Sequence, residues 1–115
     1  MLATLGKNIG EVKINLYNNN LIHIVKAHNS AIRTMSLNAN GTLLATASSK
    51  GTLIRIFDTQ NGKKIREFRR GTQTAIIRSI AFSKDSSALC VSSDNGTIHL
   101  FFINSENKNS NRQSR

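Results

Sequence analysis

The chain has no proline, no tryptophan and a single cysteine, Cys90, among its 115 residues. One cysteine excludes an intramolecular disulfide and suits a reducing compartment. Without proline, the turns have to be built from Asn, Asp and Gly. No apolar run approaches the roughly 18 residues that cross a bilayer, and the N-terminus lacks the basic region and apolar core of a secretory signal. We therefore expect a soluble intracellular protein.

Acidic residues are also scarce, since six Asp and Glu stand against sixteen Lys and Arg and leave a net charge of +10. This excess indicates a polyanionic partner, which can be nucleic acid, an anionic membrane surface or a phosphorylated ligand. The sequence contains no Ser-His-Asp order, no paired carboxylates, no phosphate-loop motif and no His, Cys, Asp and Glu set with metal-ligand spacing. We therefore predict no enzyme, no metal site and no cofactor.

What the chain does contain is a repeat with an offset of 45 residues. Residues 31–58 align without gaps on residues 76–103. Among the residues that recur unchanged are Ile32, Arg33, Leu44, Ser48, Gly51 and Thr52, which return as Ile77, Arg78, Leu89, Ser93, Gly96 and Thr97. Each copy holds three β-branched or aromatic segments separated by turns that include Asn-Gly pairs. Residues 64–70 add a fourth segment of this kind after the first copy.

Four strands in about 45 residues are typical of one blade of a β-propeller. We predict an all-β fold, a partial WD40-like propeller of about two and a half blades. The predicted parts are residues 1–30 as the end of one blade and the entry to the next, 31–70 as a complete four-stranded blade, 71–104 as most of the following blade, and 105–115 as a disordered basic tail. Propellers typically close with four to eight blades, so this chain is not expected to close a ring by itself.

Two adjacent arginines, Arg69 and Arg70, stand at the end of the fourth segment, immediately before Gly71. Neighbouring side chains on a strand point to opposite faces, so these two cations cannot easily bind one ligand together. Taken alone, the pair is also compatible with a solvated basic edge strand, which discourages pairing with another sheet edge.

The segments "ATASSKGTLIRIFDTQNGKKIREFRRG" and "CVSSDNGTIHLF" resemble the PROPPIN or WIPI family, the phosphoinositide-binding seven-bladed propellers of autophagy, and most of all its WIPI-3 and WIPI-4 type. The Phe-Arg-Arg-Gly tetrad at 68–71 is that family's hallmark, and the resemblance extends from about residue 2 to 115. It implies that the chain covers the end of blade 4, blade 5 and most of blade 6 of a seven-bladed parent.

The resemblance also implies a function. It implies recognition of phosphatidylinositol 3-phosphate and phosphatidylinositol 3,5-bisphosphate on phagophore, autophagosomal and endosomal or vacuolar membranes, by a protein that comes from the cytosol. Its partners would be autophagy proteins such as a lipid-transfer protein, and no nucleic acid is expected. The family's membrane-inserting loop should begin around Asn104, where this chain continues with polar and basic residues.

The family has two headgroup pockets, one on each side of the strand that carries the arginine pair. The resemblance assigns to the first pocket His28, Thr46, Ser48, Lys50 and Arg69. It assigns to the second pocket Arg55, Arg70, Gly71, Ser92, Ser93, Thr97 and His99. These residue types suit a phosphorylated inositol, because Arg offers phosphate a planar fork of donors and hydroxyl groups satisfy the remaining oxygens.

Several of these residues have structural alternatives. In ordinary WD repeats a histidine at the position of His28 joins a structural hydrogen-bond network. The hydroxyls of Ser48, Ser92, Ser93 and Thr97 could simply stabilise turns. His99 alternates with Ile98 and Leu100, so we predict that it faces away from the core. Cys90 is predicted to be a small core residue.

Two other functions compete with phosphoinositide binding. The main alternative is a WD40 protein–protein interaction scaffold without lipid specificity, whose basic surface meets acidic peptides. Nucleic-acid binding is a third reading, but single-strand binders combine a charged track with stacking aromatics. Here Tyr17 and the five phenylalanines fall mainly at inward-facing strand positions, which disfavours it.

Overall fold

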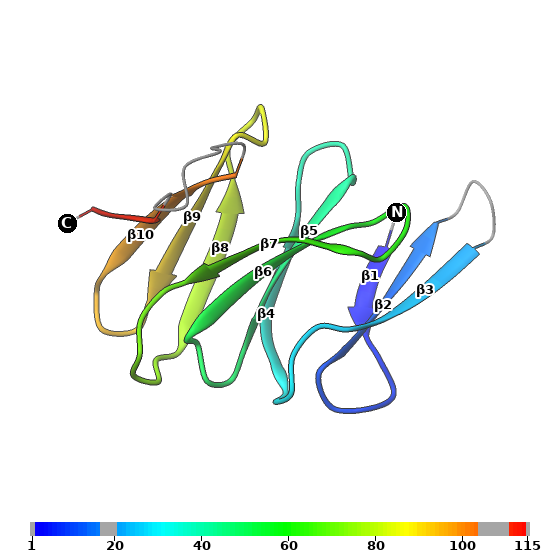
Figure 1. The fold of residues 1–115 in the computed structure, drawn as a ribbon, viewed down its shortest axis with the longest axis horizontal. Coiled ribbons are helices and arrows are strands. Elements are labelled where there is room, and N and C mark those ends of the chain that lie inside the picture. Colours follow the sequence, from blue (N-terminus) through cyan, green and yellow to red (C-terminus); the bar gives the residue numbers. More distant parts are fainter. Residues whose placement is uncertain (1, 17–20, 104–110, 115) are drawn as a thin grey trace.

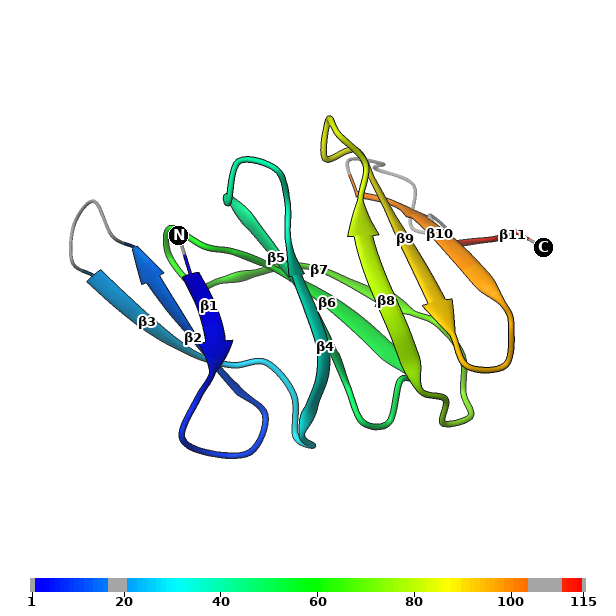
Figure 2. The same ribbon diagram turned by 180° about the vertical axis from the view of Figure 1, so that it is seen from behind.

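A computed structural model describes residues 2–16 and 21–103 and the backbone of 111–114. Within these ranges every regular element is a β-strand, and the strands form three antiparallel sheets that follow one another along the molecule (Figures 1 and 2). No helix among the described residues is long and apolar enough to cross a membrane. The prediction of an all-β fold is confirmed.

The sheets follow the order of the chain. The first sheet contains β1 (Leu2–Leu5), β2 (Glu11–Leu16) and β3 (Leu21–Lys26) in that order. The middle sheet contains β4 (Ile32–Leu37), β5 (Leu43–Ser48), β6 (Leu53–Asp58) and β7 (Lys64–Arg69). The third sheet contains β8 (Ile77–Phe82), β9 (Ala88–Ser93), β10 (Ile98–Phe102) and β11 (Asn111–Ser114).

The sequence repeat reappears as a repeat of structure. Strands β4 and β5 begin 45 residues before β8 and β9, and β6 begins 45 residues before β10. A bulge lies between Ile32 and Thr34 in the first copy and between Ile77 and Ser79 in the second, again at matching positions. Such bulges increase the local twist of a strand, so the two copies share their local shape as well as their pairing.

Two strands were not expected from the sequence. Strand β1 pairs with β2, although no strand was predicted over Leu2–Leu5. Strand β11 pairs with β10 at residues 111–114, where the sequence predicted a disordered tail over 105–115. Pairing with β10 satisfies backbone groups that would otherwise form an open sheet edge. Residues 104–110 and 115, where the family's membrane-inserting loop would begin, lie outside the described residues.

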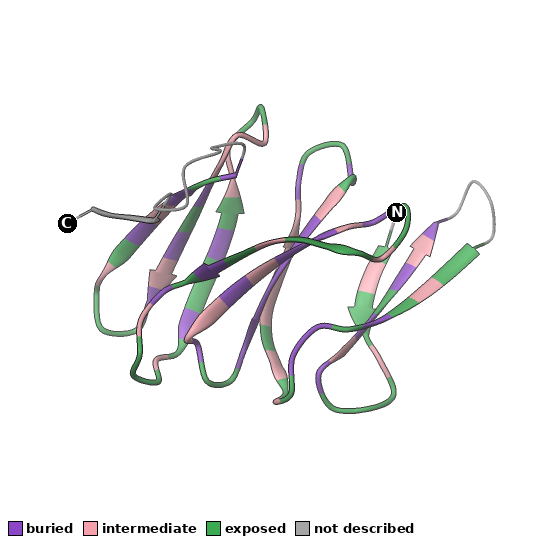
Figure 3. Ribbon diagram, in the orientation of Figure 1, coloured by how far each residue is buried: buried purple, intermediate pink, exposed green. Residues whose placement is uncertain are grey.

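Apolar side chains at every second strand position form a cluster at each of the two junctions between sheets. Figure 3 marks the buried positions of the strands in purple. At the junction of the first and middle sheets the buried residues are Val12, Ile14, Leu16, Val25, Ala27, Leu44 and Phe57. At the junction of the middle and third sheets the cluster includes Ile54, Ile56, Leu89, Val91 and the stacked rings of Phe68 and Phe101, whose centroids are 4.8 Å apart. These packed junctions fix the positions of the polar side chains beside them.

The prediction for Cys90 is wrong, because its side chain is exposed. Its neighbours Leu89 and Val91 on β9 are buried against the middle sheet. Side chains alternate along a strand, so Cys90 points to the opposite face of the third sheet. That face is not covered by another sheet within the described residues.

Five connections lie along one end of the three sheets, seen at the lower edge of Figures 1 and 2. They are residues 6–10, 27–31, 49–52, 70–76 and 94–97, and we call this end the turn rim. Gly51 shows how closely they pack, since its φ is +68° and an added Cβ would lie 1.9 Å from the Ala75 carbonyl oxygen. Only glycine fits there, and the turn after β5 therefore sits directly against the loop after β7.

Candidate functional site

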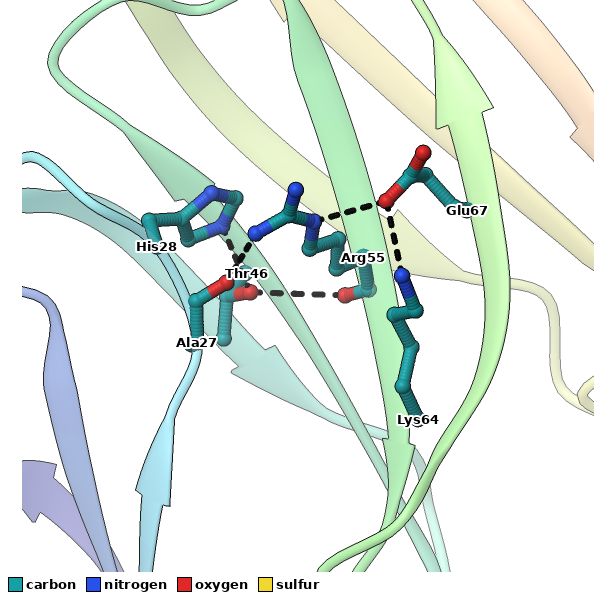
Figure 4. Close-up of polar contacts among 6 residues, drawn as sticks. All are labelled: Ala27, His28, Thr46, Arg55, Lys64 and Glu67. Atoms are coloured by element: carbon teal, nitrogen blue, oxygen red, sulfur yellow. Dashed lines mark hydrogen bonds and ion pairs between the residues drawn. The ribbon is translucent and has the colours of Figure 1, made fainter.

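The first group of predicted site residues lies where β3 leaves the first sheet and meets the middle sheet. His28 Nε2 is 2.9 Å from Thr46 Oγ1, and that hydroxyl donates to the Arg55 carbonyl oxygen at 3.4 Å (Figure 4). Both side chains are buried. His28 and Thr46 thus form part of a hydrogen-bond network that joins the two sheets, as in the structural alternative drawn from WD repeats.

Burial, together with the positive charge of Arg55, lowers the pKa of His28 to about 4. The imidazole is therefore neutral at physiological pH. A neutral ring keeps one N–H donor and one acceptor, so His28 adds hydrogen-bonding capacity to this junction but no positive charge.

Arg55 supplies the charge at this junction. It pairs on β6 with Thr46 of β5 on one side and with Glu67 of β7 on the other. Its Nε donates to Glu67 Oε1 at 2.8 Å, and its Nη1 donates to the Ala27 carbonyl oxygen at 2.6 Å (Figure 4). Lys64 Nζ lies 2.9 Å from the same Glu67 oxygen. The structure thus brings Arg55 together with His28 and Thr46, whereas the sequence prediction had grouped it with the second pocket.

A cavity of about 130 Å³ opens beside this network. Its lining residues are His28, Asn29, Ser30, Ser48, Lys50, Thr52, Leu53 and Arg55. Of the predicted first-pocket residues, His28, Ser48 and Lys50 line it, Thr46 lies buried below His28, and Arg69 is not part of the lining. Two cations, several hydroxyls and a neutral imidazole around one opening form a site that suits a small anion.

The arginine pair separates as strand geometry predicted: Arg69 is exposed, whereas Arg70 is buried with 8% of its surface accessible. Arg70 Nε donates to the Gly51 carbonyl oxygen at 2.5 Å and Nη2 to that of Gln73. Its backbone N–H donates to the Thr52 carbonyl oxygen at 2.8 Å. Arg70 therefore connects the turn after β5 to the loop after β7.

The second group of predicted residues lies at the junction of the middle and third sheets. The oxygens Ser93 Oγ and Thr97 Oγ1 are 2.8 Å apart, and Thr97 Oγ1 is 3.4 Å from His99 Nε2. Thr97 and Ser93 both donate to Asn95 Oδ1. This chain of polar groups follows the turn after β9 and ends at the buried ring of His99.

The prediction that His99 faces away from the core is wrong, since only 4% of its surface is accessible. Its ring stacks with Phe101 at a centroid distance of 6.1 Å. Along β10 (Ile98–Phe102), His99 and Phe101 are buried and face the middle sheet, whereas Ile98 and Leu100 lie on the other face of the third sheet. Burial, with a contribution from the charge of Arg70, lowers the pKa of His99.

Two further predicted residues stand apart from this chain. Ser92 lies on the opposite face of β9 from Ser93, and its Oγ is 2.7 Å from Ser79 Oγ. Gly71 follows Arg70 with open space where a Cβ would be. The structure thus joins Ser93, Thr97 and His99 directly but does not bring Ser92 to them.

The sequence prediction missed Glu67, Lys64 and Asn95. Glu67 is opposite in charge to its cross-strand partner Arg55, and pairing β6 with β7 in the correct register would have identified it. Asn95 belongs to an Asn-Gly turn, where a side-chain oxygen commonly caps the backbone. In residues 2–16 and 21–103 no cluster of His, Cys, Asp and Glu could hold a metal ion.

Comparisons with known proteins give a consistent result. The family model described as PROPPIN matches residues 2–114. Autophagy-related protein 18 of Dictyostelium discoideum is 51% identical over 89 residues, which are 77% of this chain and 24% of that protein. The solved structure of Kluyveromyces lactis Hsv2 superposes with a TM-score of 0.81 and 36% identity over 87% of this chain and 33% of that chain.

A structure titled as a complex of KlAtg21 with the coiled-coil of AgAtg16 also matches, with a TM-score of 0.74 and 26% identity over 89% of this chain and 35% of that chain. The chain therefore spans about a quarter of the curated relative and about a third of the solved structures that it matches.

Proposed function

The chain belongs to the PROPPIN family as part of an autophagy-related β-propeller, and from this premise we propose that it recognises phosphoinositide headgroups. The proposed ligands are phosphatidylinositol 3-phosphate and phosphatidylinositol 3,5-bisphosphate. Binding would bring the protein from the cytosol to phagophore, autophagosomal and endosomal or vacuolar membranes and recruit autophagy proteins there, such as a lipid-transfer protein. The protein acts in this proposal by binding and not by catalysis.

The observation that carries the proposal is the cavity at the first junction. Lys50 and Arg55 bring positive charge to one opening, and Ser48 adds a hydroxyl. Glu67 and the Ala27 carbonyl hold Arg55 in one orientation before any ligand arrives. A pre-oriented guanidinium loses less conformational entropy when it binds a phosphate, so this cavity is suited to the headgroup of a phosphorylated lipid.

The structure suggests different roles for the two members of the arginine pair. Arg69 is exposed at the end of β7, and we propose that it contacts a phosphate directly. The guanidinium of Arg70 is already bonded to the carbonyl oxygens of Gly51 and Gln73. We propose that Arg70 supports the second pocket mainly by fixing these two loops beside His99.

The test is co-sedimentation with vesicles that contain phosphatidylinositol 3-phosphate, compared with vesicles of unphosphorylated phosphatidylinositol. The variants are Lys50→Thr, Arg69→Thr and their combination, with Lys63→Thr as the matched control, because Lys63 is also exposed but lies in the turn after β6. We expect the combination to bind about thirtyfold more weakly, because each of the two basic residues contributes about 1 kcal/mol. Equal binding by all variants would contradict specific recognition.

A protein–protein interaction scaffold without lipid specificity is the second candidate. The structure of KlAtg21 with the coiled-coil of AgAtg16 supports it, because that related propeller binds a protein. Binding to an acidic coiled-coil peptide without any preference for phosphorylated lipid would favour this candidate over phosphoinositide recognition.

A further inference from the structure

The turn between β1 and β2, with the sequence Gly-Lys-Asn-Ile-Gly at 6–10, carries an isoleucine at its tip. Ile9 is 67% exposed and Leu5, at the start of the turn, is 62% exposed. These are the highest values among the large apolar residues that the structure describes. Leu5 and Ile9 line the same opening beside the turn, and neighbouring exposed apolar side chains can mark an interaction surface.

The turn is held in a fixed shape. The backbone N–H of Gly6 donates to the Glu11 carbonyl oxygen at 2.9 Å, and the Asn8 side chain donates to Glu11 Oε2 at 3.1 Å. From β3, Lys26 Nζ donates to the Ile9 carbonyl oxygen at 2.9 Å. Ile9 is therefore presented by an ordered backbone rather than by a loose loop.

The same turn is bonded to the first candidate site. The Gly10 carbonyl oxygen accepts from the backbone N–H groups of Ala27 at 2.8 Å and His28 at 3.2 Å. The φ of Gly10 is +81°, and an added Cβ would lie 1.8 Å from the His28 carbonyl oxygen. Because His28 lines the cavity at the first junction, the position of Ile9 is fixed relative to that cavity.

The corresponding turns of the other two sheets are polar. The turn after β5 carries Lys50 and the turn after β9 carries Asn95, and both lie on the turn rim with Ile9 (Figures 1 and 2). An apolar tip therefore occurs in only one of these three described turns. The exposed cation Lys7 lies beside this apolar tip. An isoleucine with a neighbouring cation suits a membrane surface whose interior is apolar and whose headgroups are anionic.

We propose that Ile9, with Leu5 beside it, enters the headgroup region of an anionic bilayer when the cavity at the first junction holds a lipid headgroup. The inference rests on the proposed phosphoinositide function and adds a membrane contact to it. Lys7 approaches the anionic surface while the isoleucine side chain is removed from water. Headgroup capture then supplies specificity, and the turn tip supplies additional affinity for the lipid phase.

The test separates membrane contact from headgroup recognition. Ile9→Ser is compared with the parent chain on vesicles that contain phosphatidylinositol 3-phosphate and, in parallel, with the water-soluble headgroup inositol 1,3-bisphosphate. We expect about tenfold weaker vesicle binding, the effect of losing one buried aliphatic side chain, and unchanged affinity for the soluble headgroup. Ile22→Ser is the matched control, because Ile22 is 49% exposed at the far end of β3.

A second variant keeps the test decisive if Ile9→Ser is poorly folded. Ile9→Trp should bind the same vesicles more tightly, because tryptophan favours the membrane interface, and its fluorescence should shift to the blue when vesicles are added. The chain contains no other tryptophan, so the signal reports position 9 alone. An Ile22→Trp control should show no shift.

The outcomes are distinguishable. If Ile9→Ser matches the parent on vesicles and Ile9→Trp shows no blue shift, the turn does not contact the membrane and only this inference fails. If Ile9→Ser also loses the soluble headgroup, the turn acts through the cavity and the inference fails as well. If the folded parent binds neither vesicles nor soluble headgroup, the proposed function itself fails.

Discussion

The two junctions between sheets use the same kinds of residue in different ways. At the first junction, Arg55 lines an open cavity and is held by one carboxylate and one carbonyl oxygen. At the second, Arg70 is buried and bonded to two carbonyl oxygens of neighbouring loops. In the proposed function the guanidinium of Arg55 serves an anion, whereas that of Arg70 mainly holds two loops together. The number of cations near a site therefore does not measure its capacity for a ligand.

Each junction also contains one buried histidine. His28 is bonded to Thr46 and lines the cavity at the first junction. His99 stacks on Phe101 and ends a chain of hydroxyls at the second. Burial lowers the pKa of both rings, so neither brings a positive charge to its junction at neutral pH.

The largest expected effect on stability comes from a substitution in the turn after β5, which contributes Lys50 to the cavity of the first junction and the Gly51 carbonyl oxygen to Arg70. Gly51→Ala places a Cβ against the Ala75 carbonyl oxygen at a φ of +68°, which we expect to lower the free energy of unfolding by about 4 kcal/mol. Gly96→Ala is the control, since its φ is +84° but nothing lies within 4 Å of the new Cβ, and about 1 kcal/mol is expected. Equal losses in denaturant titrations would show that the contact with Ala75 is unimportant.

The next effect is a pH dependence that belongs to the first junction. The pKa of His28 is about 4 in the folded chain, against about 6.5 when unfolded. Below pH 6.5 the unfolded state binds the proton more readily, so stability is complete above that pH and falls as the pH drops towards 4. The loss is at most about 3 kcal/mol.

Chemical unfolding at a series of pH values checks this prediction. A His28→Gln variant is the control, because it lacks the titrating ring and should have a flatter profile between pH 6.5 and 4. A parent profile as flat as that of the variant would mean that folding does not lower the pKa of His28.

The arginine pair allows a direct comparison of two neighbouring residues. Arg70→Met leaves two carbonyl oxygens without their donor and should cost about 2 kcal/mol of unfolding free energy. Arg69→Met changes an exposed side chain and should cost less than about 1 kcal/mol. Vesicle binding should show the opposite order: relative to the stability that each variant loses, Arg69→Met should weaken vesicle binding more than Arg70→Met. Thermal and denaturant unfolding of both variants measure the difference, and a greater stability loss for Arg69→Met would invalidate the division of roles.

The smallest effect concerns the carboxylate that orients Arg55. Glu67→Gln retains an oxygen that can accept from Arg55 Nε but loses the charge that also attracts Lys64. Because these groups are partly exposed, we expect a loss of about 0.5 kcal/mol, reduced further at high salt. A salt-independent loss would indicate that the hydrogen bond, and not the charge, stabilises this row of side chains.

The sequence predicted most of the fold because period-two patterning and turn residues act locally. The repeat located β4 to β6 and β8 to β10, and the Asn-Gly and Lys-Gly turns separated them. Strand β1 was missed since a four-residue segment carries little pattern of its own and is held by its partner β2. The face to which β10 turns His99 also depends on how the sheets pack, which a single strand does not reveal.

The candidate site was predictable only in part. Motif resemblance named the residues, and the opposite directions of Arg69 and Arg70 followed from strand geometry. The placement of Arg55 at the first junction depends on the register that sets it opposite Thr46 and Glu67. The binding of Arg70 to loop carbonyls depends on loop packing at Gly51 and Gln73. Both are tertiary features that local patterns do not contain.

The most direct test of this account is an NMR titration of the ¹⁵N-labelled chain with inositol 1,3-bisphosphate, with unphosphorylated inositol as the control. We predict that the largest amide shift changes fall at 28–30 and 48–55, the segments that line the cavity of the first junction, and that inositol causes none. Shift changes that are absent, equal for both compounds, or confined to basic residues remote from this cavity would contradict the claim that the first junction is an anion site.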